Sequence, residues 1–161
     1  MRVTILETGR APGRLSEDFP RYPDMFVSLL SRADENLAFE SVALLDGEAI
    51  PDPRNCEAIV ITGSPFGVYD STPWMDPLRD FVRETFAAGV PMVGVCFGHQ
   101  VIADAMGGDV RKSGKGWGLG RHTYQILERR PWMNDAGKSV SLSVSHQDQV
   151  ITPPREAVTL A

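Results

Sequence analysis

One of the two cysteines, Cys96, stands in a pattern suited to nucleophilic catalysis. Residues 94–98 read Gly-Val-Cys-Phe-Gly and lie between an apolar run at 91–95 and a helical pattern at 98–106. A Gly-x-nucleophile-x-Gly sequence between a buried strand and a helix is typical of a nucleophile elbow, a sharp turn that projects its central side chain into solvent. The helix N-terminus favours the thiolate, and the N–H of Phe97 is placed to stabilise an oxyanion. We therefore predict a reactive thiol at Cys96.

The other candidate motifs indicate less chemistry. Cys56 lies in a polar loop without an elbow, so we interpret it as structural or incidental. Residues 113–120 hold several glycines and a lysine, but their spacing fits neither a P-loop nor a dinucleotide fingerprint. The two cysteines and three histidines lack the spacing of a metal site. We expect no metal and no cofactor.

Strands and helices alternate through the first two thirds of the chain. The patterns predict strands at 3–6, 37–45, 58–61 and 91–95, and helices at 24–32, 75–88 and 98–106. The short, wholly apolar run 58–61 is typical of a strand buried on both faces of a parallel sheet. We predict a three-layer α/β fold of the flavodoxin-like kind, with a mostly parallel sheet and helices on both faces. In such folds the site lies at the C-terminal ends of the strands.

The remainder of the chain differs in character. Beyond residue 109 it is polar and rich in glycine, with candidate strands at 120–127 and 139–145 and a further strand-like run at 157–161. The length of 161 residues indicates one domain, 1–161.

Composition excludes several classes of protein. The net charge of −5 argues against a nucleic-acid binder. No apolar run reaches the roughly 18 residues that a membrane span requires, and the first residues do not form a signal peptide. With so few cysteines, a reducing, cytoplasmic location is expected.

Three segments together resemble the class I glutamine amidotransferases. Residues 94–100 are similar to the nucleophile motif of that family, residues 61–65 to its glycine–proline oxyanion loop, and residues 144–150 to its segment that holds the substrate glutamine. The sequence around Trp74 and Trp117 is also similar to stand-alone members, including the plant γ-glutamyl peptidases.

The resemblance implies a role for each matching residue. Cys96 would attack the side-chain amide of glutamine, form a γ-glutamyl thioester and release ammonia. The backbone N–H groups of Ser64 and Phe97 would form the oxyanion hole; serine in place of the family's usual glycine is acceptable because only the backbone is used. The implied substrate-binding residues are Gly63, Gln100, Ser145, His146, Gln147 and Asp148.

The general base of the family is a histidine in an H-x-E pair, and this chain has no such pair. None of His99, His122 and His146 is followed at the second position by Glu. His146 with Asp148 is the nearest approach, but the resemblance places His146 in the substrate-holding segment. Because 157–161 reads as a strand cut at its last residue, we expect a domain that is incomplete at its C-terminus, with the histidine and glutamate beyond Ala161. We expect these 161 residues to be weak or inactive.

Three functions stay open at this point. The first is a glutaminase that supplies ammonia to a separate ammonia-accepting synthetase. The second is a peptidase or hydrolase of γ-glutamyl compounds that uses the same thioester. The third is a non-catalytic binding domain on the same scaffold.

Overall fold

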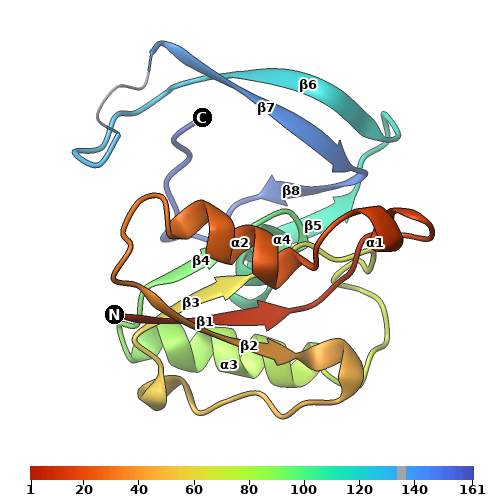
Figure 1. Ribbon diagram of the computed structural model, residues 1–161. Coiled ribbons are helices and arrows are strands. Elements are labelled where there is room, and N and C mark those ends of the chain that lie inside the picture. The colour runs from red at the N-terminus through yellow and green to blue at the C-terminus, as the bar shows by residue number, and fades with distance from the viewer. Residues whose placement is uncertain (134–136) are drawn as a thin grey trace. The chain divides into compact units, whose positions relative to one another are not determined.

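The computed structural model describes residues 1–133 and 137–161, and its contacts divide the chain into two compact units, 1–106 and 107–161 (Figure 1). The expectation of a single incomplete domain over 1–161 stays a prediction. Among the described residues, no helix is long and apolar enough to cross a membrane.

The first unit is built on a four-stranded parallel sheet with the strand order β2-β1-β3-β4. The strands are β1 (Arg2–Glu7), β2 (Ala38–Ala43), β3 (Ala58–Ile61) and β4 (Met92–Gly94). All four residues of β3 are buried, because a central strand covered on both faces leaves no position for a polar side chain.

Helices lie on both faces of this sheet, as expected for three layers (Figure 1). The helices are α1 (Leu15–Asp18), α2 (Tyr22–Leu30), α3 (Met75–Ala87) and α4 (Phe97–Ala105), with short 3₁₀ turns at Leu44–Asp46 and Pro53–Asn55. On the α2 side, Val3, Ile5 and Val60 form a core with Phe26 and Leu30. The flavodoxin-like fold predicted from the alternating pattern is confirmed.

Most elements of this unit end within two residues of their predicted bounds, and two differences have a clear physical reason. Helix α2 begins two residues earlier than expected, because Pro23 occupies the first turn, where its missing N–H costs nothing. The loop expected between β1 and α2 contains the short helix α1, whose four residues are too few to give a periodic signal.

The strand order places the functional edge of the sheet. The chain passes from β1 outward to β2 and then returns to β3 on the other side of β1, which makes the β1/β3 junction the topological switch point. The register pairs Val3 with Ala58 and Leu6 with Ile61, so both strands end at the same level. The loops that begin at Thr8 and Thr62 therefore leave the sheet together.

The second unit consists of two antiparallel strand pairs. Strand β5 (Asp109–Lys112) pairs with β8 (Asp148–Thr152), and β6 (Gly118–Gln125) pairs with β7 (Ser139–His146). The predicted bounds of β6 and β7 lie within two residues of the observed ones, whereas β5 and β8 were not predicted. Only Val110 is buried in β5, so its sequence carries no apolar alternation.

The prediction of a strand at 157–161 is wrong. These residues form no regular structure, and the carbonyl of Leu160 accepts the N–H groups of Leu127 and Glu128 at 2.8 and 3.4 Å. Two bonds to a single carbonyl do not make a strand, which requires a ladder of pairs.

Candidate active site

Cys96 occupies a strained turn between β4 and α4. Its φ of 55° and ψ of −110° make it the one non-glycine residue with positive φ in the described ranges 1–133 and 137–161. Such a conformation costs about 1–3 kcal/mol and persists only where the surrounding structure enforces it. The side chain is exposed, which agrees with the elbow expected from the sequence.

The two glycines of the elbow are required by close backbone approach. A Cβ on Gly94 would lie 2.3 Å from the carbonyl group of Gly98, and a Cβ on Gly98 would lie 2.2 Å from the carbonyl oxygen of Ile61. Neither backbone contact leaves room for a methyl group. The Gly-x-Cys-x-Gly spacing therefore brings the start of α4 against the end of β3.

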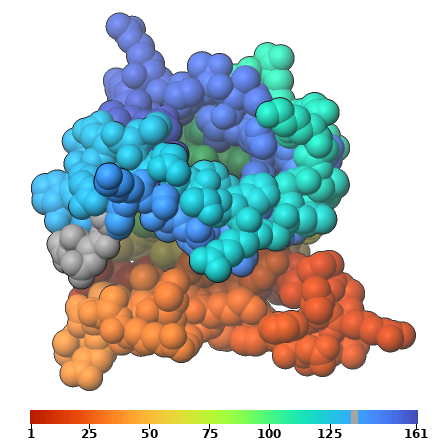
Figure 2. Space-filling model, turned by 90° about the horizontal axis from the view of Figure 1, so that it is seen from above, coloured from red at the N-terminus to blue at the C-terminus, as the bar shows by residue number. Residues whose placement is uncertain are grey.

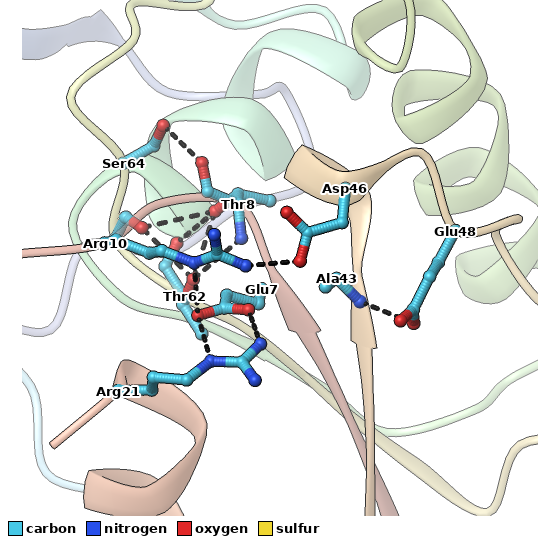
Figure 3. A network of polar contacts seen from close by, with 10 residues as sticks. Glu7, Thr8, Arg10, Arg21, Ala43, Asp46, Glu48, Thr62 and Ser64 are labelled. Atoms are coloured by element: carbon cyan, nitrogen blue, oxygen red, sulfur yellow. Dashed lines mark hydrogen bonds and ion pairs between the residues drawn. The ribbon is translucent and has the colours of Figure 1, made fainter.

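A hydrogen-bonded clamp between two threonines fixes the ends of β1 and β3. The N–H of Thr8 donates to Oγ1 of Thr62 at 3.0 Å, and Oγ1 of Thr8 donates to the Thr62 carbonyl at 3.0 Å. Both threonines are completely buried. Figure 3 shows this clamp with Ser64 beside it. The turn at Gly63 and Ser64 therefore starts from a rigid base.

The side chain of Ser64 has a structural role that the sequence did not reveal. Its Oγ donates to the carbonyl of Thr8 at 2.7 Å and accepts the N–H of Phe66 at 3.2 Å. Opposite it, a Cβ on Gly9 would lie 2.5 Å from the Cα of Ser64. The hydroxyl thus ties the expected oxyanion loop to the chain that leaves β1. One feature of the sequence could have indicated this role: a serine stands where the family that the chain resembles usually has glycine.

The loop after β3 and the elbow are joined to each other. The N–H of Gly98 donates to the carbonyl of Thr62 at 3.1 Å. Trp74 packs edge-on against both Phe66 and Phe97, with ring centroids 5.8 and 5.9 Å away. Phe97 is fully buried, so its ring anchors the backbone whose N–H we expect to serve as a donor.

These contacts bring Gly63 next to the thiol. A Cβ on Gly63 would lie 3.6 Å from the Cβ of Cys96 and 3.9 Å from Cε2 of Tyr22. Burial raises the pKa of Tyr22 above its usual value, and negative charge on Cys96 raises it further. Tyr22 is therefore a protonated phenol that lies near Cys96. Sequence reasoning missed it because it read the loop as continuing to residue 23.

A buried carboxylate pairs with Arg21, the residue before Tyr22. Glu7, at the end of β1, has no exposed surface and is bonded by Nε of Arg21 at 3.1 Å and by a second nitrogen of the same guanidinium. Nε of Arg10 lies 3.5 Å from Glu7, and Arg10 also pairs with Asp46 (Figure 3). The hydrogen bond that Arg21 donates to Glu7 raises the pKa of Arg21. This pairing compensates the burial of the charge and fixes the start of α2.

The remaining predicted residues lie in two groups. Gln100 is buried in α4, and its N–H donates to the carbonyl of Cys96 at 3.1 Å. Ser145, His146, Gln147 and Asp148 lie in the second unit, at the reversal between β7 and β8. There the carbonyl of Gln147 accepts the N–H of Ser113 at 2.9 Å.

The three histidines occupy different environments. His99 and His122 are exposed. Nδ1 of His146 lies 3.0 Å from the backbone carbonyl of Asp148. In the described ranges, no group of three or more His, Cys, Asp or Glu side chains is arranged to hold a metal ion.

Alkylation distinguishes the two thiols. Cys56 is 7% exposed and its thiol lies 3.7 Å from the carbonyl of Asp52, whereas Cys96 is exposed. A limiting amount of iodoacetamide at neutral pH should therefore modify Cys96 well before Cys56, which peptide mapping by mass spectrometry will show. Equal labelling of the two would contradict a reactive elbow thiol.

Comparison with known proteins agrees with this geometry. The family model "Glutamine amidotransferase class-I" matches residues 32–161. The chain is 32% identical to gamma-glutamyl peptidase 4 of Arabidopsis thaliana over 148 residues, which cover 87% of this chain and 58% of that protein. It is 30% identical to a glutamine-hydrolyzing GMP synthase subunit of Sulfolobus acidocaldarius over 118 residues, 73% of this chain and 61% of that protein.

Solved structures show the same fold. A glutamine amido transferase from Methylobacillus flagellatus matches with a TM-score of 0.73 and 25% identity, over 95% of this chain and 57% of that one. A glutamine amidotransferase from Thermotoga maritima matches in fold with a TM-score of 0.79 and 20% identity, over 99% and 65% of the two chains. This chain thus spans about three fifths of the curated relatives named above.

Proposed function

Because this chain belongs to the class I glutamine amidotransferase family, we propose that Cys96 is the nucleophile of a glutaminase that releases ammonia. The observation that carries the proposal is the exposed thiol in a strained turn at the N-terminus of α4. The helix end favours the thiolate. A protein that used Cys96 only for packing would have no reason to maintain this strain on a solvent-facing residue.

The proposed reaction proceeds through a thioester. The thiolate attacks the γ-carbonyl carbon of glutamine, and the carbonyl oxygen becomes an oxyanion that the N–H groups of Ser64 and Phe97 stabilise. The carbon–nitrogen bond then breaks, and the nitrogen takes a proton and leaves as ammonia. Water hydrolyses the thioester to glutamate and restores the thiol. The clamp at Thr8 and Thr62 supports the proposal because it fixes the loop that would supply one donor.

We assign substrate binding to the residues that the family resemblance indicates. These are Gly63 and Gln100 in the first unit and Ser145, His146, Gln147 and Asp148 in the second. Support for Gly63 comes from its position against Cys96, where a side chain would occupy the space beside the thiol.

A second candidate function uses the same chemistry on a different substrate. The likeness to gamma-glutamyl peptidase 4 extends over 87% of the chain and favours hydrolysis of γ-glutamyl peptides, with an amine rather than ammonia as leaving group. The likeness to part of a GMP synthase favours a separate synthetase that accepts the ammonia. Measured kcat/KM for glutamine and for a γ-glutamyl dipeptide, with the complete gene product, will rank the two. If a Cys96→Ala variant kept both activities, both candidate functions would be refuted.

We further propose that residues 1–161 alone turn over glutamine slowly. None of the three histidines belongs to an H-x-E pair, and general acid–base catalysis of this kind is worth about 10²–10⁴-fold. Ammonia release by this chain should be measured beside its His146→Ala variant. Fast turnover by the unchanged chain would contradict the proposal, and its loss in the variant would show that His146 is required for it.

A further inference from the structure

We propose that Arg79, in helix α3, is a positioning residue that fixes the loop after β3 against helix α4. These two segments carry the backbone donors that we assign to the oxyanion hole. The inference rests on the proposed function, which it deepens by naming a side chain on which the alignment of Ser64 and Phe97 depends. Arg79 lies outside both segments and acts through them.

The two assigned donors belong to different parts of the chain. Ser64 lies in the loop that follows β3, whereas Phe97 is the first residue of α4. An oxyanion hole works when both N–H groups lie about 2.7–3.1 Å from the place that the oxygen will occupy. A misplacement of about 1 Å can cost about 10²-fold in rate. The loop and the helix must therefore be held at a fixed separation.

Arg79 bonds to the loop and to the helix at once. Its Nη2 donates to the carbonyl of Val68 in the loop at 2.6 Å, and its Nε donates to Oδ2 of Asp104 in α4, also at 2.6 Å. The remaining nitrogen, Nη1, donates at 2.7 Å to Asp76, in the first turn of α3. Because a guanidinium is rigid and planar, its N–H groups point in fixed directions. The three bonds therefore set the position of Val68 relative to α4.

The loop after β3 is packed and bonded from Ser64 to Val68. Val68 is 3% exposed, and the N–H of Phe66, between the two, donates to Oγ of Ser64 at 3.2 Å. By contrast, residues 12–20 of the loop after β1 are all exposed, and Figure 2 shows the red to orange start of the chain at the surface. A displacement of the Val68 carbonyl therefore moves an internally bonded segment that contains the assigned donor.

The surroundings of Arg79 strengthen its bonds. The side chains of Arg79 and Asp104 are 23% and 26% exposed, so their ion pair is shielded from most of the solvent. Partial burial lowers the pKa of Arg79, but the hydrogen bonds and charges of Asp104 and Asp76 outweigh this and leave the pKa above its usual value. A charged donor makes a hydrogen bond roughly twice as strong as a neutral one does. The bond to the Val68 carbonyl is of this stronger kind.

Arg83, one turn further along α3, offers a matched control. Each of the two arginines pairs with an aspartate three positions earlier in the helix. Arg83 also bonds to α4, because its Nη1 donates to the carbonyl of Ala105 at 3.3 Å. Among the described residues, however, Arg83 makes no hydrogen bond to the loop after β3. The bond to that loop is therefore the contact that distinguishes Arg79.

Steady-state kinetics of the complete gene product with glutamine test the proposal. Arg79→Gln should lower kcat about tenfold or more and leave KM nearly unchanged, because an oxyanion hole acts in the transition state and not on bound substrate. Arg83→Gln should keep kcat close to that of the unchanged protein. Arg79→Lys, which still offers a cation to the loop carbonyl and to Asp104, should recover part of the rate.

Alkylation separates a misaligned oxyanion hole from a damaged thiol or a poorly folded protein. Iodoacetamide reacts with Cys96 by displacement at a saturated carbon and forms no oxyanion. We therefore expect the alkylation rate at neutral pH to be the same in Arg79→Gln as in the unchanged protein. The amount of Cys96 that is alkylated rapidly also counts the folded sites. Expressed per folded site, kcat should stay low in Arg79→Gln, whereas a merely structural role would leave it unchanged.

The outcomes separate this inference from the proposed function. Equal kcat per folded site in Arg79→Gln and Arg83→Gln would overturn the positioning role, and so would an alkylation rate that falls as much as kcat. If Arg79→Gln does not fold, Arg79→Lys and Arg83→Lys are compared in the same way, with the same expected order. Absence of Cys96-dependent turnover in the unchanged protein would overturn the proposed function, and this inference with it.

Discussion

Replacing Cys96 with alanine is expected to reduce hydrolysis of glutamine and of γ-glutamyl amides to the uncatalysed background. No other thiol can substitute, because Cys56 is 7% exposed and lies away from any elbow. Ammonia release, measured as an initial rate, is the readout. The matched control is Cys56→Ala, which removes the other thiol and should retain most of the activity.

A glycine at the same position separates catalysis from strain. Cys96→Gly should be as inactive as Cys96→Ala, yet more stable than it by about 1 kcal/mol, because glycine adopts positive φ without steric cost. Thermal unfolding of the two variants measures this difference. Substantial activity in either variant, or a glycine variant that is the less stable, would contradict the account of the elbow.

The second large effect is expected at Ser64. Ser64→Pro removes the backbone N–H that we assign to the oxyanion hole, and loss of one such donor costs about 10²–10³-fold in kcat. Ser64→Ala keeps the N–H and loses the hydroxyl bonds to Thr8 and Phe66. We expect the alanine variant to lose about 1 kcal/mol of stability for each bond and to keep kcat within about threefold.

Comparison of the two Ser64 variants decides which group acts. Steady-state kinetics below the unfolding temperature of both proteins will separate a catalytic defect from an unfolded fraction. If alanine lowered kcat as much as proline, the hydroxyl rather than the backbone would carry the role.

Local chemistry made much of the first unit predictable. Strand β3 was predicted at its observed residues, Ala58–Ile61, because a wholly apolar run between polar loops has few other interpretations. The elbow was predicted because its requirements lie within five consecutive residues. The fold class followed from the alternation of such segments.

The missed features depend on partners distant in sequence. The hydroxyl of Ser64 bonds to Thr8, 56 positions earlier, and Glu7 is explained only once Arg21 folds back over the end of β1. Strand β5 was missed because pairing with β8, rather than its own apolar content, defines it. The run at 157–161 led to a wrong strand prediction because apolar residues alone do not supply a partner strand.

Direct capture of the acyl-enzyme tests the central claim most sharply. The complete gene product should be mixed with excess glutamine, quenched in acid within the first turnovers and digested for mass spectrometry. The account predicts a γ-glutamyl adduct on the peptide that contains Cys96, removed by hydroxylamine as a thioester is. An adduct on Cys56, or glutamate formed with no adduct on Cys96 under any quench time, would contradict it.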